Sequence, residues 1–391
     1  MKKTYKALLC GAAAVAAVGI AYAMDERFFE KAKDKLTVFK CRANSKIMEQ
    51  ALPLTDAMFP GPKVVSGADS AKKIPEVLKE LNVNKVMIVT GPTVGRTIVP
   101  PIAENLERHG IGYTIYDQVE ANPSVKTVEA IRAQYLENGC DGFLAIGGGS
   151  PMDAAKAAAA RVAKPNTPIG KMAGLMKVMI KVAPIVAVPT TSGTGSEVTM
   201  GAVISDHDER HKYAIMDPNL VPKYAVLDPK LTVSMPKFVT ATTGIDALTH
   251  AVESYVTWAY NNNASNRNAE EAVVKIFRNL KRAYEDGNDL EAREAMLIAS
   301  YKAGLAFNHT GVGYVHAIAH AMGGIYNTAH GLANAVIMPI VLEDYGTAVH
   351  PQLAHLAEIT GVKTTGSDAE KANAFIAAIR QICLLYTSPS P

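Results

Sequence analysis

Hydrophobic and polar positions follow two alternating patterns in the first part of the chain, between about Val64 and Asp228. Short apolar runs rich in β-branched residues predict strands at Lys85–Thr90, Gly112–Tyr116, Gly142–Ile146, Ile185–Val188 and Tyr224–Leu227. Between them, apolar residues spaced three and four apart predict helices at Ser70–Leu81, Ser124–Leu136 and Ser150–Ala163. This alternation predicts βαβ units around a parallel sheet, which is the pattern of an α/β domain.

The second part of the chain shows only the helical pattern. Strand signals stop after Pro236, and helical spacing continues almost without interruption from Thr242 to Ile382. We therefore place a domain boundary near Leu231–Pro236. The chain is expected to consist of an α/β domain over residues 60–235 and an all-α domain over residues 236–382.

Residues 1–24 follow neither pattern. Three lysines precede an uncharged stretch from Ala7 to Met24, which contains the small-residue pattern Ala21-Tyr22-Ala23 near its end. By itself this segment predicts a signal peptide or an N-terminal membrane anchor, and its charge bias would place the remainder of the chain outside the cytoplasm. An Ala-rich helix packed against the domain is the alternative, and the sequence leaves both open.

Composition narrows the class of protein. The chain has 391 residues, of which 48% are hydrophobic, so it can bury a large core and is not mainly disordered. The 40 Lys and Arg residues nearly balance the 37 Asp and Glu residues, and no long basic run is present, which argues against a nucleic-acid partner. The four cysteines lie far apart without a CxxC pair, so we expect reduced, mostly buried thiols.

A glycine-rich run, IGGGSPMD, lies between a predicted strand and a predicted helix at Ile146–Asp153. Glycines let the backbone approach a ligand closely, and the unpaired amides of a helix N-terminus suit a pyrophosphate. The run is neither GxGxxG nor a P-loop, so its signal is weak by itself. A tight strand-to-helix turn with Ser150 as the N-cap is the alternative explanation.

A second polar loop, PTTSGTGSE, follows the next predicted strand at Pro189–Glu197. Its hydroxyls are costly to bury at the end of a buried strand and are unnecessary for a simple turn. The carboxyl ends of neighbouring parallel strands share one edge of the sheet. Two such loops therefore predict a nucleotide lying across that edge.

Two residue pairs with helical spacing contain side chains that bind metals. Asp246 and His250 form one pair, His316 and His320 form the other, and His330 follows. Residues four apart on a helix point from one face, so each pair can converge on one ligand. One carboxylate with three imidazoles suits a borderline divalent ion such as Fe²⁺ or Zn²⁺, which favours a metal site over a hydrogen-bonded histidine cluster.

Four segments together resemble the iron-containing (group III) alcohol dehydrogenase family. They are GGGSPMDAAK, PTTSGTGSE, TTGIDALTHAVESY and GYVHAIAHAMGGIYNTAHGLANAVIMP, which begin at Gly147, Pro189, Thr242 and Gly313. The resemblance covers about residues 60–380. It implies a Rossmann-like dinucleotide-binding domain followed by an all-α metal-binding domain, the two-domain architecture shared with dehydroquinate synthase.

The resemblance also implies which residues form the site. The implied metal ligands are Asp246, His250, His316 and His330. His320 matches the histidine beside the substrate and nicotinamide, where it is implied to relay the alcohol proton; orientation of a ligand is its alternative role. The implied cofactor contacts are Gly91, Asn122, Gly148, Gly149, Ser150, Asp153, Thr190, Thr191, Lys212 and Leu231.

Gly91 follows the predicted strand Lys85–Thr90, at the place where many members of the family have Asp. An acid there binds the adenosine ribose hydroxyls and repels a 2′-phosphate. The absence of an acid at residue 91 predicts that NADP(H) is accepted or preferred. The alternative is that Gly91 only serves a turn and that NAD is still bound.

The implied function is hydride transfer between NAD(P)(H) and a small primary or secondary alcohol or aldehyde, with Fe²⁺ or Zn²⁺ as the Lewis acid. The alternatives are a metal- and NAD-dependent lyase of the dehydroquinate synthase type and an inactive truncated homologue. Truncation is suggested because the family normally continues beyond Ile382, whereas residues 383–391 break the helical pattern like a foreign tail. We expect a cytoplasmic homodimer, with membrane association only if residues 7–24 form an anchor.

Overall fold

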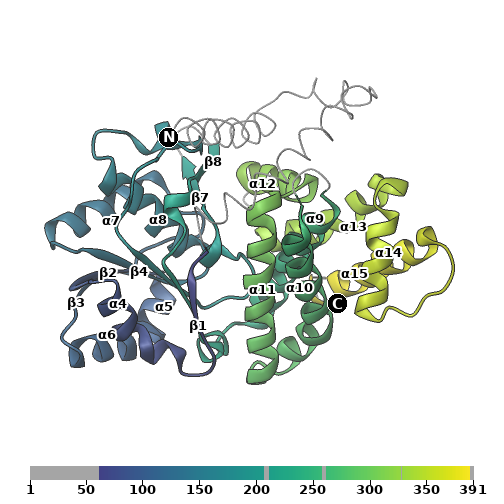
Figure 1. The fold of residues 1–391 in the computed structure, drawn as a ribbon, viewed down its shortest axis with the longest axis horizontal. Helices are drawn as coiled ribbons and strands as arrows, with labels where there is room; N and C mark the ends of the chain where they lie inside the picture. The colour runs from purple at the N-terminus through teal and green to yellow at the C-terminus, as the bar shows by residue number, and fades with distance from the viewer. Residues whose placement is uncertain (1–60, 207–210, 258–260, 327, 388–391) are drawn as a thin grey trace, which may run out of the picture.

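The computed structural model describes residues 61–206, 211–257, 261–326 and 328–387. The expected N-terminal segment, residues 1–24, lies outside them, as do the last four residues of the expected tail. An α/β domain and a helical domain lie side by side (Figure 1). This arrangement confirms the fold class expected from the two sequence patterns. Among the described helices, none combines the length and the apolar character needed to cross a membrane.

The α/β domain is built on a six-stranded sheet in which every neighbouring pair is parallel. Its strands, in spatial order, are β1 (Lys63–Ser66), β9 (Tyr224–Leu227), β6 (Ile185–Pro189), β4 (Gly142–Gly147), β2 (Lys85–Val89) and β3 (Gly112–Tyr116). The five strands predicted from the sequence are all present. β1 was not predicted, because its four residues are mostly exposed at the edge of the sheet and lack a strong apolar run.

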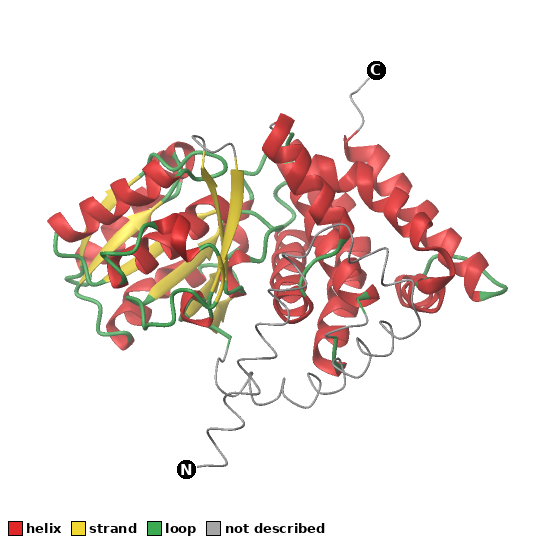
Figure 2. Ribbon diagram, turned by 90° about the horizontal axis from the view of Figure 1, so that it is seen from above, coloured by secondary structure: helices red, strands yellow, loops and turns green. Residues whose placement is uncertain are grey.

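Helices cover both faces of this sheet (Figure 2). They are η1 (Ser70–Lys73), α4 (Ile74–Glu80), α5 (Pro92–Thr97), α6 (Val99–Arg108), α7 (Val125–Glu137) and α8 (Gly149–Ala163). Alternate residues of β2 point to opposite faces: Ile88 packs in the core with α4 and α6, whereas Met87 packs in the core with α7 and α8. Burial on both faces explains why the central strands are continuous apolar runs.

A small second sheet, which the sequence analysis did not predict, adjoins the main one. Its order is β5 (Gly174–Leu175), β8 (His211–Met216) and β7 (Gly201–Asp206), with β7 and β8 antiparallel. Both hairpin strands mix polar with apolar residues, as expected where one face is solvated. The remaining short helices of this domain are η2 (Ile169–Met172), η3 (Ser196–Val198), η4 (Pro218–Leu220) and η5 (Pro229–Thr232).

The helical domain is arranged around α9 (Lys237–Val256), most of whose residues are buried. The other helices are α10 (Asn263–Glu285), α11 (Leu290–Thr310), α12 (Tyr314–Tyr326), α13 (His330–Tyr345), η6 (Gly346–Ala348), α14 (His350–Thr360) and α15 (Asp368–Thr387). A single apolar core joins them, from Ile245 on α9 to Ile379 on α15. The central position of α9 means that most of its polar side chains are buried rather than exposed to solvent.

The expected break of helical structure after Ile382 is wrong. α15 continues to Thr387, and Cys383 lies in the core of the helical domain. The residues between Cys383 and Thr387 are compatible with a helix, and the first strong helix breaker after Ile382 is Pro389. Cys140 is also buried, so both described cysteines match the expectation of buried thiols.

Candidate metal centre and cofactor edge

Asp246 and His250 both project from α9 into the interior of the helical domain. Their positions four apart place them on one face of the helix, and they are only 3% and 6% exposed. A polar pair this deeply buried requires partners, because an unpaired buried charge is costly. Those partners come from two later helices, α12 and α13.

α12 supplies His316 and α13 supplies His330. Asp246, His250 and His316 each offer a ligand atom, and these atoms all lie within 4.8 Å of one another. Nε2 of His330 lies 3.3 Å from Oδ1 of Asp246, and Nε2 of His316 lies 3.5 Å from the same oxygen. The structure thus brings the four expected metal ligands together around one carboxylate.

Burial and mutual charge set the protonation of this cluster. Burial opposes the charge of Asp246, but His250, His330 and His316 hold its pKa well below the usual range. Burial lowers the pKa of His250 to about 3, which keeps its imidazole neutral. Burial by itself would lower the pKa of His316. Hydrogen bonds to Asp246 and Glu253 outweigh this effect and raise the pKa to about 9.

The chemistry of the cluster fits a divalent metal ion. Within the part of the chain that the structure describes, Nδ1 of His250 is buried and has no hydrogen-bond partner. Phe307 stacks on the His250 ring with centroids 4.2 Å apart, which provides an apolar wall. One carboxylate and three imidazoles in a largely buried site are a donor set for Fe²⁺ or Zn²⁺.

Two residues of this centre were missed by the sequence analysis. Glu253 contacts Nδ1 of His316 at 2.5 Å, and Asn334 donates from Nδ2 to Oδ1 of Asp246 at 2.7 Å. Both are fully buried. Their spacing contained a signal, because Glu253 is seven residues after Asp246 and Asn334 is four residues after His330, on the same helix faces.

His320 lies one helical turn beyond His316 and beside the cluster rather than in it. Its ring centroid is 4.8 Å from that of His330 and 6.2 Å from that of His316. Burial lowers the pKa of His320 to about 3, and the nearby imidazoles of His330 and His316 act in the same direction. The side chain is therefore a neutral imidazole next to the candidate metal ligands.

The two polar loops predicted to share one edge of the sheet do pack together. The Cβ atom that an alanine would have at Gly148 would lie 3.2 Å from Oγ1 of Thr191, and the one at Gly149 would lie 2.9 Å from Cγ2 of Thr194. The glycines are therefore required by close approach of the second loop. The helix α8 begins at Gly149 with Gly148 as its N-cap residue, so Ser150 does not cap it.

Asn122, Ser150 and Lys212 come together from three parts of the α/β domain. The backbone N–H of Asn122 donates to Oγ of Ser150 at 3.3 Å, and Nζ of Lys212 donates to Oδ1 of Asn122 at 3.0 Å. Asn122 has a φ of 60°, a left-handed conformation that asparagine tolerates better than most residues. Lys212 also lies near Gly323 of α12, so this group borders the helical domain.

Asp153 is directed into the protein. Its Oδ1 accepts from Oγ of Ser196 at 2.7 Å, and its Oδ2 accepts from a backbone N–H of β7 at 2.9 Å. Lys156, fully buried one turn later, donates to the carbonyl oxygens of Ser196, Thr199 and Gly201 at 2.6, 2.9 and 2.8 Å. These two side chains connect α8 to the end of the polar loop and the start of β7.

The other expected cofactor residues lie at ends of the sheet strands. The N–H of Thr190 donates to the carbonyl of Gly147 at 2.9 Å, which joins the ends of β6 and β4. Gly91 follows β2 and is the N-cap residue of α5. Leu231 lies in η5 and packs against the core on the α4 and α6 face of the sheet.

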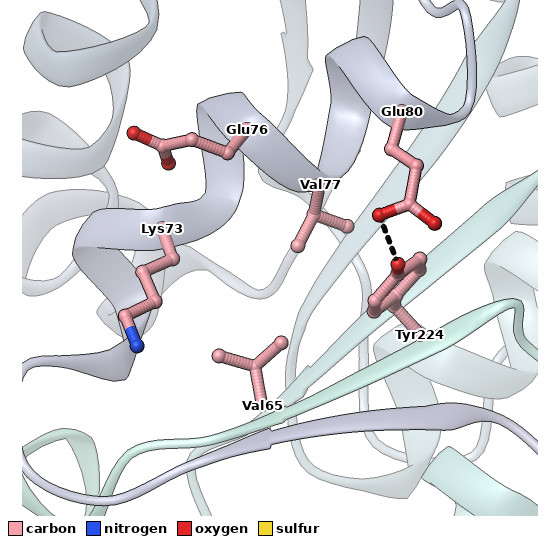
Figure 3. Close-up of a pocket in the computed structure, with 6 residues that line it drawn as sticks. All are labelled: Val65, Lys73, Glu76, Val77, Glu80 and Tyr224. Carbon is pink, nitrogen blue, oxygen red and sulfur yellow. Dashed lines mark hydrogen bonds between the residues drawn. The ribbon is translucent and has the colours of Figure 1, made fainter.

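A hollow of about 370 Å³ lies between α4 and the strands β1 and β9 (Figure 3). It is lined by Val65, Lys73, Glu76, Val77, Glu80 and Tyr224. The hydroxyl of Tyr224 donates to Oε2 of Glu80 at 2.5 Å, as the dashed line in Figure 3 indicates. No residue of this hollow belongs to the metal cluster or to the expected cofactor contacts.

Comparison with known proteins gives matches along nearly the whole described chain. Residues 61–229 match the family model described as iron-containing alcohol dehydrogenase. Residues 240–388 match the model described as the C-terminal part of the Fe-containing alcohol dehydrogenase family. Residues 230–239, between the two matched regions, include most of η5 and the start of α9.

Relatives with named activities are similar to most of the chain. A NAD-dependent methanol dehydrogenase of Bacillus methanolicus is 36% identical, over 86% of this chain and 88% of its own length. A 1,3-propanediol dehydrogenase of Klebsiella pneumoniae is 38% identical, over 71% of this chain and 72% of its own. The crystal structure of a 1,3-propanediol oxidoreductase superimposes with a TM-score of 0.81 at 35% identity, covering 84% of this chain and 86% of that one.

Proposed function

Because the chain belongs to the iron-containing alcohol dehydrogenase family, we propose that it transfers a hydride between NAD(P)(H) and a small primary or secondary alcohol or aldehyde. The observation that carries this proposal is the convergence of Asp246, His250 and His316 in a buried cluster with His330 beside it. Relatives named as methanol dehydrogenase and 1,3-propanediol dehydrogenase support a small alcohol as the substrate class.

The proposed metal ligands are Asp246, His250, His316 and His330, with Fe²⁺ as the ion and Zn²⁺ as an ion that the same donors accept. When bound, the ion supplies Lewis-acid polarisation of the substrate oxygen. The role of the protein is to hold the donors in the correct form. Asp246 stays ionised, and the burial of His250 keeps its imidazole unprotonated.

We assign His320 the movement of the alcohol proton. Its imidazole lies next to the ligand His330, and a neutral imidazole has one free ring nitrogen that can accept a proton. The side chain is only partly exposed, so it lies between the buried cluster and the surface. Orientation of a ligand is the alternative role, and the metal content of His320→Ala distinguishes the two roles.

The proposed cofactor site follows the carboxyl edge of the main sheet. Its residues are Gly91, Asn122, Gly148, Gly149, Ser150, Asp153, Thr190, Thr191, Lys212 and Leu231. The N-terminus of α8 and the glycines before it provide amides for the pyrophosphate. Both oxygens of Asp153 already accept hydrogen bonds, so we propose that Asp153 supports the loop rather than contacting the cofactor itself.

The surroundings of the site favour an oxidoreductase over a lyase of the dehydroquinate synthase type. The helix turn around His320 consists of Ala317, Ile318, Ala319 and Ala321, which suit an uncharged alcohol or aldehyde. The named relatives are likewise oxidoreductases of alcohols and aldehydes. We propose a homodimer that works in the cytoplasm, where nicotinamide cofactors are plentiful.

Metal analysis combined with a substrate panel tests this function. The purified protein is expected to contain Fe or Zn at about one ion per chain. It is expected to oxidise NADH or NADPH in the presence of small aldehydes, and to lose this activity after treatment with a chelator. A chain that binds neither ion and consumes neither cofactor with any aldehyde would refute the proposal.

A further inference from the structure

Glu253 lies on α9 two turns after Asp246 and is 1% exposed. Its two carboxylate oxygens bind consecutive residues of α12. Oε1 accepts from the backbone N–H of Val315 at 2.7 Å, and Oε2 contacts Nδ1 of His316 at 2.5 Å. Both oxygens of this buried carboxylate are therefore engaged by the protein, and neither is left to bind a ligand.

This contact determines which nitrogen of His316 can bind a metal. A carboxylate accepts hydrogen bonds, so Nδ1 of His316 carries the proton and donates it to Glu253. A metal binds this ring once Nε2 has lost its proton, and the lone pair is then on Nε2, the atom that lies 3.5 Å from Oδ1 of Asp246. Metal-bound histidines commonly have such a partner on the other ring nitrogen, and that partner fixes the tautomer and the ring orientation.

We propose that Glu253 is a positioning residue of the metal centre: it holds His316 in the tautomer and orientation that direct the Nε2 lone pair at the metal. The inference rests on the proposed metal site and adds a residue to which that site assigns no role. Glu253 also supplies the start of α12 with an acceptor, because Val315 is the second residue of that helix. One side chain therefore orients both the helix and the ligand on it.

The local packing leaves this carboxylate little freedom. A Cβ atom at Gly313 would lie 2.7 Å from Oε1 of Glu253, so the chain approaches the carboxylate closely only because residue 313 is glycine. The next residue of α9, Ser254, accepts a hydrogen bond from Thr310 at 3.0 Å. These contacts hold α9 against the chain that enters α12, and they keep Glu253 directed at His316.

The isosteric substitution Glu253→Gln separates a positioning role from a structural one. The glutamine oxygen can still accept from Val315, but its amide then faces His316 as a donor and requires the proton of the ring to be on Nε2. That tautomer cannot bind a metal through Nε2. The shape and the number of hydrogen bonds are preserved, so the apo-protein is expected to melt within a few degrees of the unchanged protein.

Competition with a chelator measures the affinity for Co²⁺, whose visible absorption also reports the ligand set. Glu253→Gln is expected to weaken Co²⁺ binding by about 10- to 100-fold and to change the spectrum of the bound ion. Glu253→Asp keeps a carboxylate but shortens its reach, so an intermediate loss is expected. Glu270→Gln is the matched control: Glu270 faces Tyr255 and His355 in the same domain, away from the cluster, and its loss should leave the affinity unchanged.

Each outcome decides between the hypotheses. If the unchanged protein binds no Co²⁺, Fe²⁺ or Zn²⁺, the proposed function fails. If it binds Co²⁺ and folded Glu253→Gln binds it equally well with the same spectrum, only the positioning role fails. If neither Glu253 variant yields a folded apo-protein, Glu253 belongs to the fold alone, and the inference is overturned. Equal weakening in Glu270→Gln would also overturn it.

Discussion

At the residue scale, the candidate metal centre depends on one carboxylate shared by several imidazoles. Oδ1 of Asp246 accepts from Asn334 and lies within 3.5 Å of Nε2 of both His316 and His330. A shared, buried anion holds these donors together even before a cation is added, because its charge would otherwise be uncompensated. Each imidazole therefore contributes to the preformed geometry as well as to metal affinity.

Replacing one proposed ligand tests this arrangement. His250→Ala and His330→Ala are each expected to abolish turnover and to reduce metal content to a small fraction, because one of four donors is lost. The fold should remain largely intact, since the apolar core of the helical domain is untouched. Metal analysis and circular dichroism provide the measurements. Full metal content in both variants would show that the ligands are misassigned.

His320→Ala is expected to differ from the ligand variants. It should keep the metal and slow hydride transfer, because the proton acceptor is removed while the four ligands stay. Single-turnover kinetics over a range of pH, together with metal analysis, make the comparison. Metal loss equal to that of His250→Ala would instead make His320 a ligand or the support of one.

Gly91 is the residue that we expect to control the preference between NADPH and NADH. Gly91→Asp should shift the preference from NADPH toward NADH by about tenfold or more, roughly 1.4 kcal/mol, because the new charge faces the 2′-phosphate. The backbone at Gly91 is extended, and a Cβ atom would lie 3.2 Å from the carbonyl oxygen of Val119, so only a small shift is needed. The ratio of kcat/KM for the two cofactors measures the change.

Gly91→Asn is the matched control for this substitution. It has the same shape as the Asp variant without the charge, so most of the NADPH preference should remain. A large preference of the unchanged enzyme for NADH, or an equal shift in the Asn and Asp variants, would contradict the electrostatic explanation.

At the scale of elements, the contact between α9 and α13 sets the distance between the ligands. A Cβ atom at Gly331, next to His330, would lie only 2.2 Å from the carbonyl oxygen of Thr242 on α9. The two helix backbones can approach this closely only because residue 331 has no side chain. Asp246 is one turn further along α9, so the same contact brings His330 to it.

Gly331→Ala should therefore push α13 away from α9. We expect a loss of about 1–3 kcal/mol in the free energy of unfolding and weaker metal binding, because overpacking moves His330 from Asp246. The control is Gly324→Ala on α12, where the added Cβ would meet no described atom within 4 Å beyond its own helix backbone, so the effect on stability should be small. Thermal unfolding and metal titration of both variants test this; equal behaviour would contradict it.

At the scale of the whole molecule, α11 connects the metal centre to the cofactor domain. Phe307 of α11 stacks on His250, and a Cβ atom at Gly304, one turn earlier, would lie 2.6 Å from Cγ2 of Val198 and 3.0 Å from the carbonyl oxygen of Gly195. Gly195 lies near the end of the polar loop that the proposed cofactor site uses, and Val198 directly follows that loop. The contact therefore sets how the two domains meet.

Gly304→Ala should shift the position of the helical domain relative to the α/β domain without removing the metal. We expect lower kcat and a higher KM for the cofactor, because nicotinamide and metal must be aligned closely for transfer. Metal content should stay at the level of the unchanged enzyme. Gly201→Ala in β7 is the control, since its added Cβ would meet no described atom within 4 Å beyond its two chain neighbours. Unchanged kinetics in Gly304→Ala would mean that the interface tolerates a shift.

The sequence by itself determined the elements whose pattern is local. Strands such as β4 and β6 are buried on both faces, so they are short, continuous apolar runs rich in β-branched residues. The spacing of Asp246 and His250 placed both on one face of a helix, because the period of a helix is a property of the chain itself. The glycine-rich run and the polar loop were likewise placed correctly at strand ends.

Only the tertiary structure decided which of these faces meet. Glu253 and His316 are 63 residues apart, and Asn334 and Asp246 are 88 apart, so no local period relates them. The hairpin of β7 and β8, which brings Lys212 to Asn122, was missed for the same reason: its strands are stabilised by pairing with each other. Local spacing determines which face of an element is buried, but long-range packing determines what that face contacts.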